Sequence, residues 1–287
     1  MKKLFIFLFL LPFFFFPLLT HADLTTELRG YYSLNGNSTD DTGINNGTDT
    51  AITYSNGNGI IPQGAGFNGT TSKIMLPANG FSNAQMASGS IELWFKTSSI
   101  PSVEDDLLSI EGWISIQIDV TTGKLIVQSD GTPTFASSAG SVCDGNWHQC
   151  ILTWDATHTN LYLDNGSPIT VTPTGSPTPD STSRTNAIGA QWSGTLGFFT
   201  GDIDEVGIWS RALTSTEVGQ LYNSGAGLAY PFTVTPIAWS GSEGGICAEG
   251  EVCYYDWLIP VGIIIFFLSL IVCGPIIKSL FPRKWKS

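Results

Sequence analysis

Residues 186–225 read NAIGAQWSGTLGFFTGDIDEVGIWSRALTSTEVGQLYNSG, and this stretch decides the fold. Its apolar run over residues 203–209 carries two acids and precedes a polar break, a pattern typical of a buried strand that ends in a turn. Thr214 and Glu217 have capping-box spacing, in which each side chain can accept a free backbone amide of the other residue. Gly225 stands where a short helix would end. The stretch therefore predicts a strand, a turn, one or two helical turns and the end of a domain.

Outside this stretch, short apolar segments recur between clusters of Gly, Asn, Ser and Thr. They lie at residues 30–34, 73–76, 91–95, 107–110, 114–118, 125–127, 150–154 and 161–163. Segments of this length, separated by glycine-rich breaks and without a long helical period, are typical of an all-β protein. About 200 residues suffice for one domain with a core of its own, so we predict a single all-β domain.

The segment GDIDEVGIWSRALTSTEV, residues 201–218, resembles the C-terminal signature of laminin G-like, concanavalin A-like jelly-roll domains. Four further segments lie upstream in the order of that family: YYSLNGNSTDDTGINNGT (31–48), GAGFNGTTSKIMLP (64–77), SIELWFKT (90–97) and DGNWHQCILTWDATHTNLYLDNG (144–166). The resemblance covers about residues 25–227. It implies a two-sheet antiparallel jelly-roll β-sandwich, and we place the domain at residues 23–227.

The first residues have the pattern of a secretory signal peptide. Two lysines precede an uninterrupted apolar run over residues 4–19, and Thr20 and Ala22 supply small residues at the −3 and −1 positions of a cleavage site. We therefore predict a signal helix over residues 1–22 that is cleaved after Ala22. The alternative is an uncleaved N-terminal anchor, and with either one the following domain is exported.

The C-terminal part has the pattern of a membrane anchor. Residues 257–277 carry no charge, and at about 1.5 Å per residue they can cross a hydrocarbon core about 30 Å thick. The basic residues in 278–287 predict a cytoplasmic tail, because Lys and Arg stay on that side of the membrane. The Pro/Gly/Ser-containing residues 228–256 predict a juxtamembrane stalk. The domain would then lie outside the cell or in the periplasm.

Charge agrees with that topology. All 24 acidic residues lie between Asp23 and Asp256 together with six of the 12 basic ones, which gives this part of the chain a formal charge of 6 − 24 = −18. A surface this acidic argues against binding of nucleic acid or anionic lipid, since both depend on Lys and Arg to neutralise phosphates.

The cysteines fit an oxidising compartment. Four of the five cysteines lie outside the predicted membrane segment and allow three pairings, and we prefer Cys143–Cys150 with Cys247–Cys253 because each bridge closes a short loop. A metal site at these residues is disfavoured, because neither spacing is C-x-x-C and no His pair lies nearby.

No catalytic motif stands out. Jelly-roll glucanases carry an E-x-D-x-E run that places alternate acids on one face of a strand, and the nearest match here is DIDEV at residues 202–206, which lacks the flanking glutamates. The chain also contains no G-x-S-x-G and no H-E-x-x-H. We therefore expect a protein that is not an enzyme, with a glycoside hydrolase as the alternative.

A calcium site follows from the family resemblance. In similar domains a Gly/Asn-rich loop and the acid of the I-D-E motif hold a structural calcium, which assigns the side chains of Asp40 and Asp204 and a carbonyl near Gly43 as ligands. The alternative assignment is that Asp40 and Asp41 form a turn and Asp204 accepts backbone amides.

Ligand binding would use aromatic residues in loops. Sugars are held by aromatic platforms and polar groups, and Trp192, Trp113, Tyr54 and Phe199 lie in or beside predicted loops. We rank Trp192 first because it lies between two glycines in a loop. By contrast, Trp94, Trp154 and Trp209 lie in predicted strands and are assigned to the core.

These expectations combine into one prediction. The protein is a signal-cleaved, single-pass surface protein whose extracellular or periplasmic domain binds a glycan or a protein with calcium assistance, for adhesion or recognition. Because folds of this kind serve many functions, a bacteriophage virion or envelope protein used for host attachment is the main alternative.

Overall fold

We analysed a computed structural model of the chain. It describes residues 23–232, except residues 79, 82–85, 104, 111–113, 130–135, 172–184 and 192. The expected signal peptide, transmembrane segment and cytoplasmic tail lie outside the described residues, as does nearly all of the expected stalk. Within the described part of the chain, no helix combines the length and the apolar character needed to span a bilayer.

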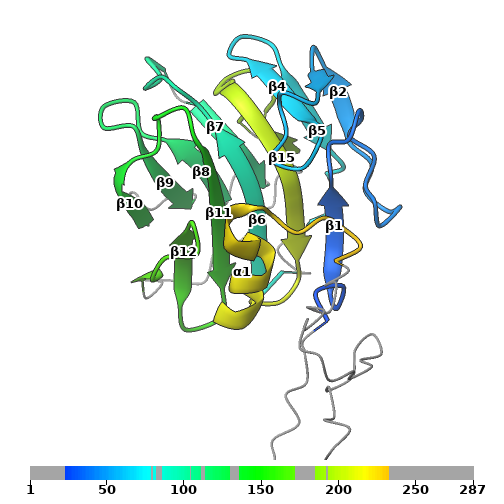
Figure 1. The fold of residues 1–287 in the computed structure, drawn as a ribbon, viewed down its shortest axis with the longest axis vertical. Helices are drawn as coiled ribbons and strands as arrows, with labels where there is room; N and C mark the ends of the chain where they lie inside the picture. Colours follow the sequence, from blue (N-terminus) through cyan, green and yellow to red (C-terminus); the bar gives the residue numbers. More distant parts are fainter. Residues whose placement is uncertain are drawn as a thin grey trace, which may run out of the picture. The chain divides into compact units, whose positions relative to one another are not determined.

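The described domain is a sandwich of two antiparallel sheets, which confirms the predicted all-β class (Figure 1). The first sheet, sheet A, has the strand order β13 (Ile169–Val171), β12 (Thr159–Leu163), β11 (Trp147–Trp154), β6 (Gly89–Lys96), β15 (Thr200–Trp209), β4 (Gly64–Asn68) and β3 (Thr53–Ser55), and β1 (Leu28–Tyr32) also pairs with β15. The second sheet, sheet B, has the order β10 (Ala136–Ser141), β9 (Lys124–Ser129), β8 (Ile114–Ile118), β7 (Asp105–Ile110), β14 (Asn186–Ile188), β5 (Lys73–Leu76) and β2 (Thr48–Thr50).

Strand β15 is the centre of sheet A. It pairs with β6 along one edge, while β4 and β1 share the other edge, β4 along its first half and β1 along its second. Ile203, Val206 and Ile208 face the interior between the sheets. A bulge between Asp204 and Gly207 interrupts the alternation, and Glu205 there has a positive φ of 49°.

Two apolar clusters hold the domain together. The larger one fills the space between the sheets with side chains from both inner faces. The smaller one lies on the outer face of sheet A and contains Leu24, Tyr31, Ile151, Tyr162, Trp209, Leu213, Val218, Leu221 and Phe232. We call it the outer cluster. Because Phe232 is only 9% exposed, the packed domain extends beyond the boundary expected at residue 227 and includes the first residues assigned to the stalk.

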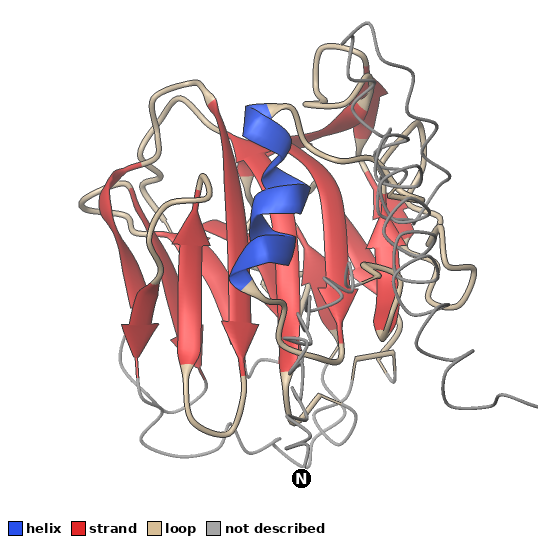
Figure 2. Cartoon of the chain, turned by 60° about the horizontal axis from the view of Figure 1, so that its bottom comes forward, coloured by secondary structure: helices blue, strands red, loops and turns tan. Residues whose placement is uncertain are grey.

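The predicted short helix is present as α1 (Ser215–Tyr222), which lies across the outer face of sheet A (Figure 2). Thr214 and Glu217 form the predicted capping box, in which the Thr214 hydroxyl accepts the amide of Glu217 and the Glu217 carboxylate accepts the amide of Thr214. The helix ends at Asn223, which has left-handed backbone angles, and continues into the 3₁₀ turn η2 (Asn223–Gly225).

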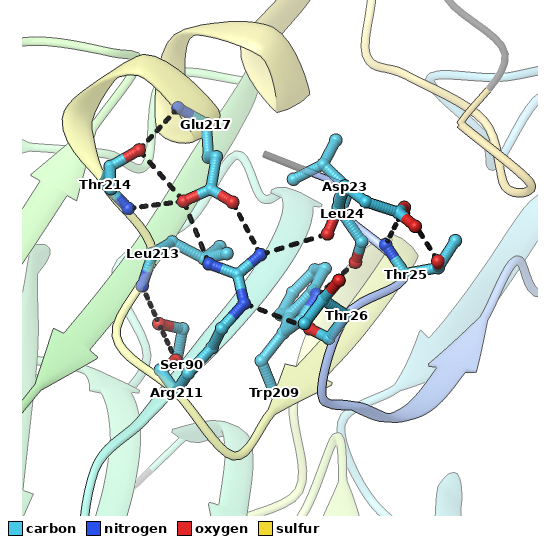
Figure 3. Close-up of polar contacts among 10 residues, drawn as sticks. All are labelled: Asp23, Leu24, Thr25, Thr26, Ser90, Trp209, Arg211, Leu213, Thr214 and Glu217. Atoms are coloured by element: carbon cyan, nitrogen blue, oxygen red, sulfur yellow. Dashed lines mark hydrogen bonds and ion pairs between the residues drawn. The ribbon is translucent and has the colours of Figure 1, made fainter. Parts of the chain in front are cut away.

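Arg211 joins this helix to the N-terminal segment (Figure 3). Its guanidinium donates to both carboxylate oxygens of Glu217 and to the carbonyls of Thr26 and Asp23. Beside it, the indole of Trp209 donates to the carbonyl of Leu24 over 2.7 Å. Both ends of the described chain are therefore fastened to the outer face of sheet A, near the last residues of β15.

The opposite end of the sandwich carries its own set of loops. Pairing of Asp105 with Ile118 places the β6–β7 connection and the β8–β9 turn at the same end, and a bridge between Asp106 and Phe198 adds residues 189–199. We call this the loop end.

Candidate functional site

The first candidate region is a group of buried polar side chains on the outer face of sheet A. Glu92 on β6, Gln149 on β11 and Glu205 in the β15 bulge all lie on this face, together with Tyr31 of β1. The Gln149 amide donates to Glu92 over 2.7 Å, and the Tyr31 hydroxyl donates to Glu205. Glu92 and Glu205 are each only 1% exposed. We call these residues, with Asp204, the carboxyl cluster.

The carboxyl cluster is poorly suited to ionisation. Burial raises the pKa of Glu205 to about 7, and burial together with the Glu205 charge raises that of Asp204 to about 8. The pKa of Glu92 is also raised, first by burial and then by Glu205. These carboxyl groups therefore hold protons near neutral pH. Their burial keeps them away from any large substrate.

The second candidate region is residues 189–191 and 193–199, which we call the rim loop. Backbone hydrogen bonds attach it to β7 in sheet B. The amide of Gly189 donates to the carbonyl of Leu107, and the amide of Asp106 donates to the carbonyl of Gly197, each over 2.9 Å. The amide of Phe199 donates to the carbonyl of Gly189 over 3.0 Å and closes the loop. The rim loop therefore leaves β14, turns at the loop end and returns to β7 before the chain crosses to β15.

The rim loop is also closed on itself. The amide of Gln191 donates to Leu196 over 3.1 Å, and that of Gly194 donates to Gln191 over 2.7 Å. From the neighbouring strand β5, the ammonium of Lys73 donates to the carbonyl of Gly194. Loops held this firmly on a rigid sheet are a common place for binding residues.

Glycines make this path possible. Gly189, Gly194 and Gly197 have φ values of 72°, 63° and 65°, in the left-handed region that side chains rarely adopt. A Cβ atom at Gly197 would lie 2.2 Å from the Asp106 carboxylate, and one at Gly189 would lie 2.1 Å from the ring of Phe67. The shape of the rim loop is thus fixed by three positions that tolerate only glycine.

Two adjacent acids lie beneath the rim loop. Asp106 accepts a hydrogen bond from the Ser115 hydroxyl on β8. Burial and the charge of Asp106 raise the pKa of Asp105 to about 8. Both side chains are buried, so they support the loop rather than project from it.

The surface of the rim loop combines polar and apolar groups. The hydroxyls of Ser193 and Thr195 lie 2.8 Å apart, and Leu196 is 62% exposed. The ammonium of Lys73 lies 5.9 Å from the ring centroid of Phe198. Such a surface can bind a ligand by hydrogen bonds and apolar contact, and it contains no carboxylate placed for acid–base chemistry among its described residues.

The residues predicted for calcium bind different parts of the backbone. The Asp40 carboxylate accepts amides of its own loop and of β1, including Asn45 over 2.7 Å and Tyr31 over 3.0 Å. Gly43, with φ 81°, donates its amide to the Asp40 carbonyl. These are the contacts of the alternative assignment, a turn-forming aspartate.

Asp204 accepts amides from a separate segment, those of Ile60 and Ile61 over 2.9 and 3.1 Å. Its other oxygen has no hydrogen-bond partner, whereas both oxygens of Asp40 are used. In the described part of the chain, no three His, Cys, Asp or Glu side chains are grouped to hold a metal. The assignment of Asp40 and Asp204 as ligands and calcium binding itself both stay predictions.

The aromatic candidates are placed only in part. Trp192 and Trp113 lie outside the described residues. Tyr54 lies on β3, where its hydroxyl donates to Asp49 over 2.9 Å and its ring packs against the inner core. Phe199 is fully buried between the sheets. Phe199 therefore cannot stack on a ligand, whereas Tyr54 is partly exposed and its role in binding stays a prediction.

The predicted Cys143–Cys150 disulfide is not formed in the structure, because both residues are free thiols. Cys150 faces the inner core on β11, opposite Leu93 and Leu163, and is fully buried. Cys143 lies against the carbonyl of Gly123 at 3.6 Å. Burial raises both thiol pKa values, which makes them poor nucleophiles. Cys247 and Cys253 lie outside the described residues.

Sequence reasoning missed the carboxyl cluster and the support beneath the rim loop. Glu92 and Gln149 come together only through strand pairing, which no local motif reveals. The sequence of the rim loop did contain a signal, because its three glycines indicate a backbone path with repeated left-handed turns. Sequence analysis used two of these glycines only to place Trp192 in a loop.

Comparison with known proteins agrees with this architecture. A family model described as the concanavalin A-like lectin/glucanases superfamily matches residues 68–219. No curated protein matches the chain in a sequence search.

Several solved structures share the fold. Domain 4 of AbnA, an extracellular arabinanase from Geobacillus stearothermophilus solved with arabinotriose, aligns with a TM-score of 0.55 and 22% identity over 70% of this chain and 98% of its own. Trypanosoma rangeli sialidase in complex with sialic acid aligns with a TM-score of 0.52 and 17% identity, over 71% of this chain and 34% of its own. The binding domain of Botulinum neurotoxin DC in complex with rat synaptotagmin II aligns with a TM-score of 0.51 and 15% identity, over 69% of this chain and 52% of its own.

Proposed function

The chain belongs to the concanavalin A-like lectin/glucanase superfamily, and we propose that it is an exported, membrane-anchored recognition module that binds a glycan or a protein at its rim loop without catalysing a reaction. Anchoring rests on the sequence patterns of residues 1–22 and 257–277.

The observation that carries the proposal is the contrast between a rigid base and an exposed tip. Six backbone hydrogen bonds and three glycines hold the described part of the rim loop in one path, while Thr195 and Leu196 stay exposed. A preorganised loop loses little conformational entropy when it binds, which favours recognition.

The fold relatives support both ligand classes. The arabinanase domain was solved with arabinotriose and the sialidase with sialic acid, whereas the neurotoxin domain was solved with a protein, synaptotagmin II. At these identities the likeness concerns the fold, so the choice between glycan and protein is left to experiment.

The position of the acids supports a function without catalysis. A retaining glycosidase needs two carboxyl groups about 5–5.5 Å apart that both reach the substrate. Here Glu92 and Glu205 lie buried on the outer face of sheet A, and Asp105 and Asp106 lie beneath the rim loop. Calcium would assist binding indirectly, by stiffening loops, if the Asp204 oxygen takes part in a site.

The test is a glycan array with soluble residues 23–232, in buffer with calcium and with chelator. The double variant Thr195→Ala/Leu196→Ser should lose the signal, whereas Ile44→Ser, which changes an exposed residue in another loop, should keep it. A signal that survives the double variant would contradict the rim loop as the site. Reducing sugar released by the wild-type domain would contradict the non-catalytic assignment.

A further inference from the structure

The domain expected after signal cleavage contains two methionines, and the structure places them differently. The chain has three methionines in all, and the first of them is Met1 of the expected signal peptide. Met86 is buried in the inner core with 1% of its surface exposed. Met75 lies on β5 and is half-buried. Because an oxidant must reach a thioether before it can react with it, an oxidant in solution attacks Met75 before Met86.

Met75 is in contact with the rim loop. A Cβ atom at Gly194 would lie 2.6 Å from the Met75 sulfur, so Gly194 rests directly on the thioether. The Met75 side chain points away from the inner core, because its strand neighbours Ile74 and Leu76 belong to that core and side chains alternate along a strand. The rim loop therefore covers one side of Met75 on the outer face of sheet B.

Lys73 lies beside Met75 beneath the same glycine. The same added Cβ atom would lie 3.2 Å from Cδ and 3.3 Å from Nζ of Lys73, so the sulfur and the ammonium are close to one point of the loop. The ammonium donates to the carbonyl of Gly194. A hydrogen bond from a charged donor contributes more to stability than one between neutral groups. This bond therefore fastens the rim loop to β5.

Oxidation of the Met75 sulfur would change both contacts. In the reaction with hydrogen peroxide, the sulfur lone pair attacks one peroxide oxygen and the O–O bond breaks. An S–O bond forms and water leaves, so the sulfur loses two electrons and the peroxide gains them. The product is a polar sulfoxide, which is larger than the thioether. Its oxygen would press against Gly194 and would compete with the Gly194 carbonyl for the Lys73 ammonium, which can only donate.

We propose that Met75 is an oxidation-sensitive support of the rim loop, and that its conversion to methionine sulfoxide by a peroxide releases the loop from β5. The release is reversible, because methionine sulfoxide reductases restore the thioether. The modification and the release rest on the contacts of Met75 and Lys73 alone. Only the resulting loss of ligand binding rests on the proposed recognition function.

The first measurement locates the oxidation. Residues 23–232 are treated with hydrogen peroxide, and all samples carry Cys143→Ser because the half-buried Cys143 thiol reacts with the same reagent. Peptide mass spectrometry should find an added oxygen on Met75, while Met86 stays unmodified. Oxidation of Met86 in preference to Met75 would overturn the inference.

The second measurement follows the loop without any ligand, by amide hydrogen exchange in NMR spectra. The amides of Gln191 and Gly194 close the rim loop and should exchange roughly tenfold faster in the oxidised domain, since a charged hydrogen bond that holds the loop is lost. The amides of Gly189 and Phe199, which attach the base of the loop, should keep their rates. Unchanged exchange at Gln191 and Gly194 in the sulfoxide form would overturn the inference.

Two variants separate Met75 from other oxidised groups. Met75→Leu keeps the apolar volume, so its exchange rates should not respond to peroxide. Met75→Gln places a polar acceptor at the same position and should raise the exchange rates without peroxide. Equal acceleration by peroxide in Met75→Leu would assign the effect to another residue and overturn the inference. If the loop is released but a glycan-array signal persists, the inference stands and the proposed binding site at the rim loop falls.

Discussion

The outer face of sheet A and the loop end place the same kinds of side chain in opposite environments. On sheet A, large rings and aliphatic side chains pack beneath α1 and the chain ends, and acids are buried with them. At the loop end, aliphatic side chains are exposed and ionised aspartates lie beside them, while Asp105 and Asp106 are buried beneath the rim loop.

This difference separates stability from recognition. Burying the outer cluster and the carboxyl cluster in one place fastens both chain ends to the sandwich, at the cost of carboxyl groups that must stay protonated. At the loop end, backbone hydrogen bonds and glycines fix the rim loop, whereas the exposed side chains contribute little to stability and are free to vary. Changes of buried side chains on sheet A should alter folding, and changes of exposed side chains at the loop end should alter binding.

The largest effect is expected from the centre of the outer cluster. Trp209→Ala removes a fully buried ring that also donates a hydrogen bond to Leu24, and should lower the free energy of unfolding by about 3–5 kcal/mol. Urea unfolding of residues 23–232 measures it. Ile44→Ser should change the value by no more than about 0.5 kcal/mol. Equal effects of both variants would remove the distinction between the two regions.

A second effect concerns pH. The pKa values of Glu92, Asp204 and Glu205 are raised in the folded state, so the folded state keeps protons that the unfolded chain releases near pH 4. The free energy of unfolding should therefore fall by a few kcal/mol as pH rises from about 4.5 to about 8. Each unit by which the pKa of a group in the folded state exceeds its pKa in the unfolded chain corresponds to about 1.4 kcal/mol.

Urea titrations across that range would test this expectation. Glu205→Gln should flatten the dependence, since it removes one titrating group and its influence on the other two. His148, whose pKa is raised mainly by its hydrogen bond to Asp164, and Asp105, whose pKa is raised by burial and by Asp106, act in the same direction, so His148→Gln and Asp105→Asn are the controls for their shares. A stability that rises with pH over this range would contradict the protonated carboxyl cluster.

The rim loop should respond to a single methyl group. Gly197→Ala requires an alanine with left-handed backbone angles and places its Cβ 2.2 Å from the Asp106 carboxylate. It should lower the free energy of unfolding by about 2 kcal/mol and weaken ligand binding. Gly140→Ala is the matched control, because a Cβ there meets nothing within 4 Å. If Gly197→Ala binds normally, the rim loop does not need its present path.

The smallest effect is expected at the helix cap. Thr214→Ala removes the hydroxyl that accepts the amide of Glu217 and should destabilise the domain by about 1 kcal/mol. Thr216→Ala, an exposed change within α1, should be neutral or slightly stabilising because Ala favours helices. Thermal unfolding followed by circular dichroism compares the two, and glycan binding should be unaffected by both.

The fold was largely predictable from local patterns. The apolar run over residues 203–209 became β15, and the spacing of Thr214 and Glu217 became a true capping box. The C-terminal limit was harder, because Tyr230 and Phe232 stand among Pro, Gly and Ser and resemble a linker. Only their packing on Tyr31, with ring centroids 5.5 and 5.1 Å away, shows that they belong to the domain.

The candidate site was less predictable, because it depends on register. Regular alternation along β15 would place Glu205 on the same face as Ile203, in the inner core, but the bulge after Asp204 places Glu205 on the outer face beside Tyr31. Likewise, Glu92 and Gln149 meet only because β6 and β11 pair in one register. The calcium ligands Asp40 and Asp204 came from family resemblance, which carries no information on which amides each carboxylate already accepts.

The closeness of Leu24, Trp209 and Phe232 has a mechanical consequence. A force that separates the two chain ends acts on the outer cluster first and then opens β1 from Leu28, one residue pair at a time. A force between a ligand at the loop end and the chain at Phe232 instead runs along β15, where its hydrogen bonds to β6 share the load. Single-molecule pulling should therefore measure a low unfolding force when the two chain ends are pulled apart, and a higher unfolding force when the domain is pulled between a bound ligand and Phe232.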